Sequence, residues 1–313
     1  MRPSQRFIQI VLGVIWLVDG ILQFQPYMFT KDFATDVLAG AGQGQPAFVA
    51  HPVTAMAQFL TPHIAFWNAI FATIQVLIGV GILIRRTVKP ALVVSFGWVI
   101  AVWWFAEAFG QMFGGSATIL NGAPGAVLLY GLIGALVWPT GQSREISASG
   151  SGLVGDMGGR IIWAVLWILD AALQFLPANH AKGALSSAIT GAASGEPGFL
   201  ASISNHVGHT IKGFGPEIAI LLGIAEVLIG LGVLGKRPNI ALMAGAALAL
   251  VIWVVGQDLG GILTGQGTDP NAGPLYILLA LTCYQWPNTV SERFSFRSLR
   301  VRERSVDQVP ASA

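Results

Sequence analysis

Long apolar runs separated by short polar segments dominate this chain. A helix needs about 20 apolar residues to cross roughly 30 Å of hydrocarbon, and some shorter runs come close to that length. The eight runs cover residues 7–26, 64–84, 90–110, 123–138, 161–177, 216–235, 238–257 and 273–287. Proline stands at or near most of their ends, as is typical of helix boundaries. The pattern predicts an all-α, polytopic membrane protein with eight transmembrane helices.

The second half of the chain repeats the first. Two long matches, each at an offset of 151 residues, are WLVDGILQFQP (16–26) with WILDAALQFLP (167–177) and QVLIGVGIL (75–83) with EVLIGLGVL (226–234). Later positions align at an offset of 150, which pairs Trp103 with Trp253 and Pro124 with Pro274. Because each copy holds four spans, both enter the membrane in the same direction. The sequence therefore predicts two parallel four-helix repeats.

The repeats define the domain organisation that we expect. In order, it is a first repeat (1–140), a flexible cytoplasmic linker rich in Ser and Gly (141–159), a second repeat (160–287) and a basic cytoplasmic tail (288–313). A long insert follows the first span of each repeat, at 27–62 and 178–215. Each insert contains several phenylalanines that need burial, so short helices on the outer surface are expected instead of disorder.

Composition and charge support a membrane location. Only 10% of the residues are charged, against about 25% in soluble domains, and 54% are hydrophobic with a mean hydropathy of +0.66. With the N-terminus inside, 14 of the 17 basic residues fall in cytoplasmic segments, and only Lys31, Lys182 and Lys212 fall outside. This asymmetry predicts a plasma-membrane protein with both termini cytoplasmic. Its main partner is the lipid bilayer, and no nucleic-acid surface is expected.

Polar groups inside the apolar runs are the candidate functional residues, because they are costly in a membrane. They are Asp19, Gln23, Gln75 and Glu107 in the first repeat, and Asp170, Gln174, Glu226, Gln257 and Asp258 in the second. Helical rise predicts that Asp19 meets Gln75 and that Gln23 meets Glu107, in a cluster facing the extracytoplasmic side. Three roles stay open: interhelical clamps, a ligand or quinone pocket, and an ion or proton path.

The histidines and the single cysteine add little chemistry. His206 and His209 are three residues apart and would share a helix face, as metal ligands often do. Their equivalents in the first repeat are Ala55 and Gln58, so interfacial histidines without a metal are the alternative. Cys283 is the only cysteine, which excludes a disulfide framework.

Glycine is dense after the third span of each repeat, in FGQMFGGSATILNGAPG and LGGILTGQGTDPNAGP. These segments have no GxxxxGK[ST] motif and no nearby Lys or Arg, so a phosphate cradle is not predicted. A tight re-entry of the chain at the outer surface is expected instead.

The second-helix endings VLIGVGILIRR and VLIGLGVLGKR, each with a basic turn before the third span, resemble the DoxX-like group of DoxX, DoxD and MauE. The resemblance covers about 80 residues in each repeat and transfers no catalytic residue. It implies an accessory membrane subunit or scaffold of a redox or quinone-linked assembly, with a membrane protein partner or a homo-oligomer.

The alternatives to an accessory subunit are a small-solute or ion-coupled transporter and a membrane enzyme with a quinone pocket. No catalytic motif points to an enzyme, no cofactor is identified, and paired histidines for haem are missing from the spans.

Overall fold

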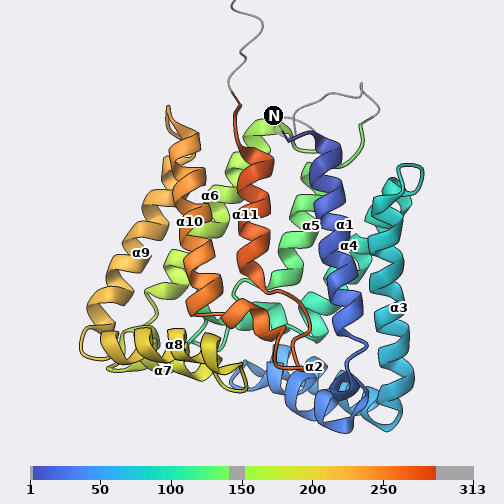
Figure 1. Ribbon diagram of the computed structural model, residues 1–313, viewed down its shortest axis with the longest axis horizontal. Helices are drawn as coiled ribbons and strands as arrows, with labels where there is room; N and C mark the ends of the chain where they lie inside the picture. The colour runs from blue at the N-terminus through green and yellow to red at the C-terminus, as the bar shows by residue number, and fades with distance from the viewer. Residues whose placement is uncertain (1–2, 141–151, 287–313) are drawn as a thin grey trace, which may run out of the picture. The chain divides into compact units, whose positions relative to one another are not determined.

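The computed structural model describes residues 3–140 and 152–286, and these residues form helices without a strand (Figure 1). The longer helices are α1 (Gln5–Leu22), α2 (Ala47–Leu60), α3 (Ile64–Leu83), α4 (Val88–Phe105), α5 (Ala126–Leu136), α6 (Gly155–Gln174), α7 (Ala184–Ala192), α8 (Gly198–Ile211), α9 (Gly215–Gly232), α10 (Pro238–Val255) and α11 (Ala272–Cys283). Each of the eight apolar runs overlaps one of these helices.

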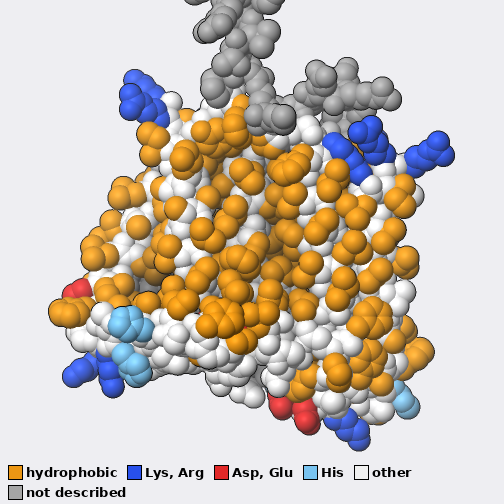
Figure 2. Space-filling model, in the orientation of Figure 1, with side chains coloured by type: hydrophobic (Ala, Val, Ile, Leu, Met, Phe, Trp, Pro, Cys, Tyr) orange, Lys and Arg blue, Asp and Glu red, His pale blue; other side chains and the backbone are white. Residues whose placement is uncertain are grey.

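Among the described residues, five helical segments are long and apolar enough to cross a membrane. They are Gln5–Leu22, Ala47–Leu83, Val88–Phe105, Gly215–Gly232 and Pro238–Val255. Two shorter apolar helices, α5 and α11, lie beside each other between them (Figure 1). On the face seen in Figure 2, hydrophobic side chains cover the region between the ends, while Lys and Arg gather at the ends. A helical membrane protein is therefore confirmed.

The first two apolar-run helices of each half, α1 with α3 and α6 with α9, pack closely through glycine. A Cβ on Gly79 of α3 would lie 2.9 Å from the Gly13 carbonyl oxygen of α1, so only glycine permits this approach. Gly230 of α9 lies in the same way against the Ala164 carbonyl of α6, at 3.1 Å. Small residues at a helix contact let the backbones approach and gain dispersion energy, which replaces the missing hydrophobic drive in lipid.

The predicted inserts do form short helices. In the first, α2 follows three short turns, Pro26–Phe29, Phe33–Leu38 and Gly40–Gly42. In the second, α7 and α8 pack together and lie across the ends of the long helices (Figure 1).

The linker predicted at 141–159 ends too late, because its last residues belong to a helix. Helix α6 already begins at Gly155, where Asp156 in the first turn pairs with Arg160 at 3.2 Å. An acidic residue in the first turn, with an i,i+4 partner, favours helix over coil. Residues 141–151 of the linker and the whole 288–313 tail lie outside the described residues.

Both halves close their third helix with the same hydrogen bonds. The Trp103 indole donates to the Pro124 carbonyl at 2.8 Å, and the Trp253 indole donates to the Pro270 carbonyl at 2.7 Å. The alignment of Pro124 with Pro274 was therefore wrong: the loop of the second half is four residues shorter, and the offset at this point is 146 instead of 150. Proline repeats in the segment, at 270 and 274, and this misled the sequence comparison.

Substitution of Gly110 tests this loop geometry. Gly110 has φ +63°, and a Cβ there would meet the Pro124 carbonyl carbon at 2.2 Å. We expect Gly110→Ala to lower the free energy of unfolding by about 1–2 kcal/mol, because a residue with a Cβ is strained in the left-handed conformation. The clash with Pro124 adds to this loss. Thermal unfolding in mild detergent measures this, with Gly97→Ala as the control, because a Cβ at Gly97 meets nothing within 4 Å. Equal midpoints for the two variants would contradict the close approach.

Candidate functional site

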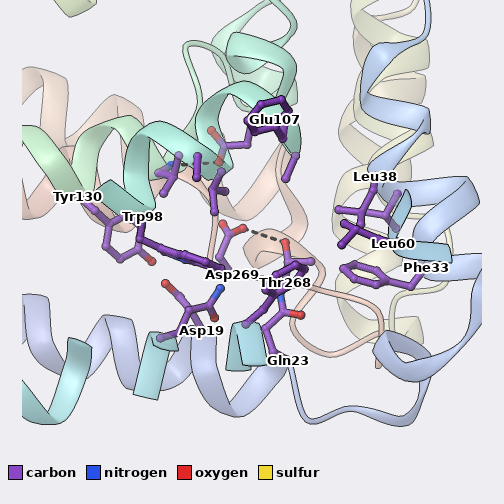
Figure 3. A pocket seen from close by; sticks show the side chains of 18 of the residues that line it. Asp19, Gln23, Phe33, Leu38, Leu60, Trp98, Glu107, Tyr130, Thr268 and Asp269 are labelled. Atoms are coloured by element: carbon purple, nitrogen blue, oxygen red, sulfur yellow. Dashed lines mark hydrogen bonds between the residues drawn. The ribbon is translucent and has the colours of Figure 1, made fainter. Parts of the chain in front are cut away.

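The first half of the chain encloses a cavity of about 240 Å³, which we call the inner cavity. Helices α1, α3, α4 and α5, the first insert and the loop before α11 all contribute to it (Figure 3). Its lining residues include Trp16, Asp19, Gln23, Phe33, Leu38, Leu60, Phe71, Gln75, Trp98, Phe105, Glu107, Tyr130, Thr268 and Asp269. The cavity therefore brings together the four polar residues predicted for the first repeat.

Three carboxyl groups line the inner cavity, each from a different element. Asp19 lies on α1 and is 3% exposed, and Glu107 follows the end of α4. Asp269 comes from the second half of the chain, in the loop that precedes α11. In Figure 3 the Asp19 and Asp269 side chains lie near Trp98 and Tyr130. None of the lining residues is Lys, Arg or His.

Glu107 caps the short helix α5. Its Oε1 accepts a hydrogen bond from the Val127 amide at 3.0 Å, which satisfies one of the free N–H groups at the helix N-terminus. Burial, followed by the repulsion of Asp269, raises the pKa of Glu107 to about 8, although the Val127 hydrogen bond opposes the shift. Glu107 therefore exchanges its proton near neutral pH and lies beyond the end of the α4 span.

Asp269 is held in place by its own loop. Thr268 Oγ1 donates to Oδ2 at 2.8 Å, and the Asn271 amide donates to Oδ1 at 2.7 Å. Burial raises the pKa of Asp269, while these two hydrogen bonds lower it. Donors on both oxygens favour the ionised form, so Asp269 is the lining carboxylate best prepared to keep a negative charge.

Many polar atoms at the inner cavity have no hydrogen-bond partner. The buried ones are Trp16 Nε1, Asp19 Oδ1, Gln23 Oε1, Gln75 Oε1, Trp98 Nε1 and Glu107 Oε2. Leaving a buried polar group unpaired costs about 1–3 kcal/mol. These atoms converge on one cavity, where a polar ligand or water would satisfy them.

The opposite end of the inner cavity is apolar. Phe33, Leu38 and Leu60, all from the first insert, face the polar end across the cavity (Figure 3). The insert therefore forms one wall, and it positions hydrophobic side chains opposite the carboxyl groups.

A second, more polar cavity of about 410 Å³ adjoins the first, and we call it the outer hollow. The two share Val37, Ala106, Glu107 and Asp269. The other lining residues of the outer hollow include the exposed Asp36, Gln43, Gln111 and Asn121. Glu107 and Asp269 thus lie at the junction between the solvent-accessible hollow and the buried cavity.

The predicted polar residues on α6 and α9 of the second half form a buried cluster. The Tyr276 hydroxyl donates to Asp170 Oδ2, and Glu226 is fully buried with neither oxygen bonded. Gln174 is also buried, one turn after Asp170. The predicted residues of α6 and α9 therefore lie inside the bundle.

The loops before α5 and α11 cross between the halves. Ile119 and Leu120, from the first half, pack on α7 and α10 of the second. Gln257 fixes this crossing, because its Nε2 donates to the Ile119 carbonyl at 2.7 Å and its Oε1 accepts from the Gly273 amide at 3.1 Å. In return, Thr268 and Asp269 enter the inner cavity. The exchange inserts apolar residues into one half and a carboxylate into the other.

Two predicted residues lie outside both clusters. Gln257 belongs to the loop crossing, and Asp258 accepts a hydrogen bond from Ser204 Oγ at 2.6 Å, which ties α8 to the end of α10. Both follow Gly256, the C-cap of α10, and this position separates them from Asp170 and Glu226.

The histidine pair shows no metal centre. His206 and His209 are both exposed on α8, and no group of three or more His, Cys, Asp or Glu side chains in the described ranges is arranged to hold a metal ion.

Sequence reasoning missed Asp269, Tyr130 and Trp98. Asp269 stands in the glycine-dense segment, where no helical periodicity indicates which way a side chain points. Tyr130 and Trp98 look like ordinary apolar residues of a span, and only their position at the cavity marks them. Searching each apolar run for Tyr and Trp at the depth of Asp19 would have found both.

Comparison with protein-family models, with curated proteins and with solved structures found no match.

The pH dependence of stability tests the burial of Glu107. Its ordinary pKa is 4.5 and its pKa in the folded protein is about 8, so the folded state binds the extra proton between these values. This contribution to stability is fully present below about pH 4.5 and is lost as pH rises to about 8. We expect Glu107→Gln to flatten the fall of the thermal midpoint between pH 5 and 8, while keeping an acceptor for Val127. An unchanged slope, equal to that of the exposed-site control Glu217→Gln, would refute the assignment.

Proposed function

We propose that this chain is a multi-pass membrane protein that takes a small polar solute from the extracytoplasmic side into its first repeat, as solute transporters do. One observation carries the proposal: six buried, unpaired polar atoms converge on the inner cavity, which adjoins a hollow with exposed polar residues. Buried polar groups in folded proteins are nearly always hydrogen-bonded to protein, water or a ligand.

The proposal includes the predicted topology of eight spans in two parallel repeats. Matching interactions support it, since Trp103 and Trp253 bond to equivalent proline carbonyls, and Glu107 and Gln257 each accept from an amide at the start of the next helix. The short α5 and α11 would then span with the help of the loops that precede them.

The orientation follows from charge. We place both termini in the cytoplasm of a plasma-membrane protein, because the basic turns between α3 and α4 and between α9 and α10 share an end with the N-terminus (Figure 1). The outer hollow then opens to the outside, where the inserts lie.

The accessory-subunit role and the DoxX-like resemblance stay predictions. A partner-binding role does not account for the unpaired polar atoms, whereas a solute site does.

Cysteine labelling tests both access and orientation. The only native cysteine, Cys283, is buried and gives a low background. We expect Ala106→Cys, at the junction of the two cavities, to react with a membrane-impermeant thiol reagent added to intact cells. Thr87→Cys, exposed at the opposite end, should react only after permeabilisation, and the lipid-facing control Ile100→Cys should react in neither case.

Two outcomes would overturn parts of the proposal. Labelling of Thr87→Cys in intact cells would reverse the orientation. Failure of Ala106→Cys to react in intact cells and after permeabilisation would show that the inner cavity does not open through the hollow.

A further inference from the structure

We infer that the occupant of the inner cavity is a small organic cation, either a protonated amine or a quaternary ammonium ion. This inference rests on the proposed function, because it names the class of solute for the same site.

Charge is the first argument. Asp19, Glu107 and Asp269 line one cavity, and no basic side chain lines it. Asp269 accepts hydrogen bonds on both oxygens, which favours a permanent negative charge in the cavity. A charge away from water is strongly stabilised by an opposite charge a few ångströms away, so this site favours cations and repels anions.

The aromatic walls favour an organic cation over a metal ion. Trp16 and Tyr130 lie with ring centroids 4.5 Å apart, and Phe71 and Trp98 lie 5.5 Å apart, all four at the inner cavity. Ammonium groups are attracted to the faces of such rings, by about 0.5–2 kcal/mol each. Inorganic cations need a close shell of oxygen ligands, and no group of three or more His, Cys, Asp or Glu side chains among the described residues is arranged to hold a metal ion.

Size limits the cation. About 240 Å³ corresponds to roughly eight water molecules at about 30 Å³ each. It is below the roughly 300–1,000 Å³ of sites for drug-sized ligands. The apolar wall of Phe33, Leu38 and Leu60 suits the alkyl groups of the cation, opposite the carboxylates (Figure 3). The unpaired indole N–H groups of Trp16 and Trp98 are available to an oxygen atom on the same molecule.

The second half provides a built-in contrast. At the offset of 146, the counterpart of Asp269 in the second half is the apolar Ala123, which packs in one cluster with Leu173 of α6. Asp269 therefore determines cation specificity in the first half.

Binding of matched probes to the purified full-length protein tests the inference. The cations are tetramethylammonium, choline and tetraethylammonium, and 3,3-dimethylbutan-1-ol is the neutral counterpart of choline with the same shape. We expect at least one cation to bind about tenfold or more tightly than the alcohol, measured by calorimetry and by the rise in thermal midpoint. Asp19→Asn and Asp269→Asn should each weaken cation binding by about tenfold and leave alcohol binding unchanged. Glu196→Gln, a carboxyl group that does not line the cavity, is the matched control.

The pH profile gives an independent readout. A bound cation favours the ionised form of Glu107, so its affinity should rise between pH 6 and pH 8.5, and Glu107→Gln should remove most of this rise. The other titratable groups facing Glu107 are Asp269 from the loop before α11, Asp19 from α1, Tyr130 from α5 and Asp36 from the first insert.

The outcomes separate the two proposals. Equal binding of choline and the alcohol would overturn the cation inference and leave the solute site in place. If no cation of the series binds, the inference also fails, and labelling of Ala106→Cys then decides whether a solute site exists at all. Loss of cation binding in Glu196→Gln as well as in Asp269→Asn would mean that general charge, and not the cavity, attracts the probes.

Discussion

Much of the structure depends on the shortness of helices α5 and α11. Helices α5 and α11 have 11 and 12 residues, so each rises only about 16–18 Å of the roughly 30 Å of a hydrocarbon core. On the proposed eight-span topology, non-helical chain completes the crossing, and its backbone groups need partners inside the protein because lipid offers none. Trp103, Trp253 and Gln257 supply such partners. The loops, the cavities beside them and the crossing between the halves all follow from this requirement.

The crossing also makes two similar halves chemically different. One receives a threonine and an aspartate beside the inner cavity, and the other receives Ile119 and Leu120 against its helices. The halves further exchange acid for amide, with Gln75 and Glu107 in the first and Glu226 and Gln257 in the second. The inner cavity, with its three carboxyl groups, is lined mainly by the first half. On the proposed duplication, the scaffold supports one specialised site and keeps the matching hydrogen bonds that hold its loops.

The sequence predicted the helices far better than it predicted the site. Each of the eight apolar runs coincides with one helix. The meeting of four predicted polar residues at one cavity followed from helical rise, because distances along a helix are regular; these residues are Asp19, Gln23, Gln75 and Glu107. Asp269 was missed because it reaches the cavity from a loop more than 240 residues after Asp19, through a run of left-handed residues that has no periodicity. Gln257 was placed in the wrong cluster for the same reason, since the chain turns immediately after α10. The sequence pattern predicts where the side chains of a regular helix lie, but it does not predict this for a glycine-dense loop.

The exchanged loops have a consequence for how this protein can change over time. A substitution at Thr268 or Asp269 changes the loop of its own half and also the cavity of the other half. The sequence of one half therefore cannot change at these positions without affecting the other half, and neither half alone contains the complete site. On the proposed duplication, the exchange of loops made two equivalent copies depend on each other, so that they must be kept together.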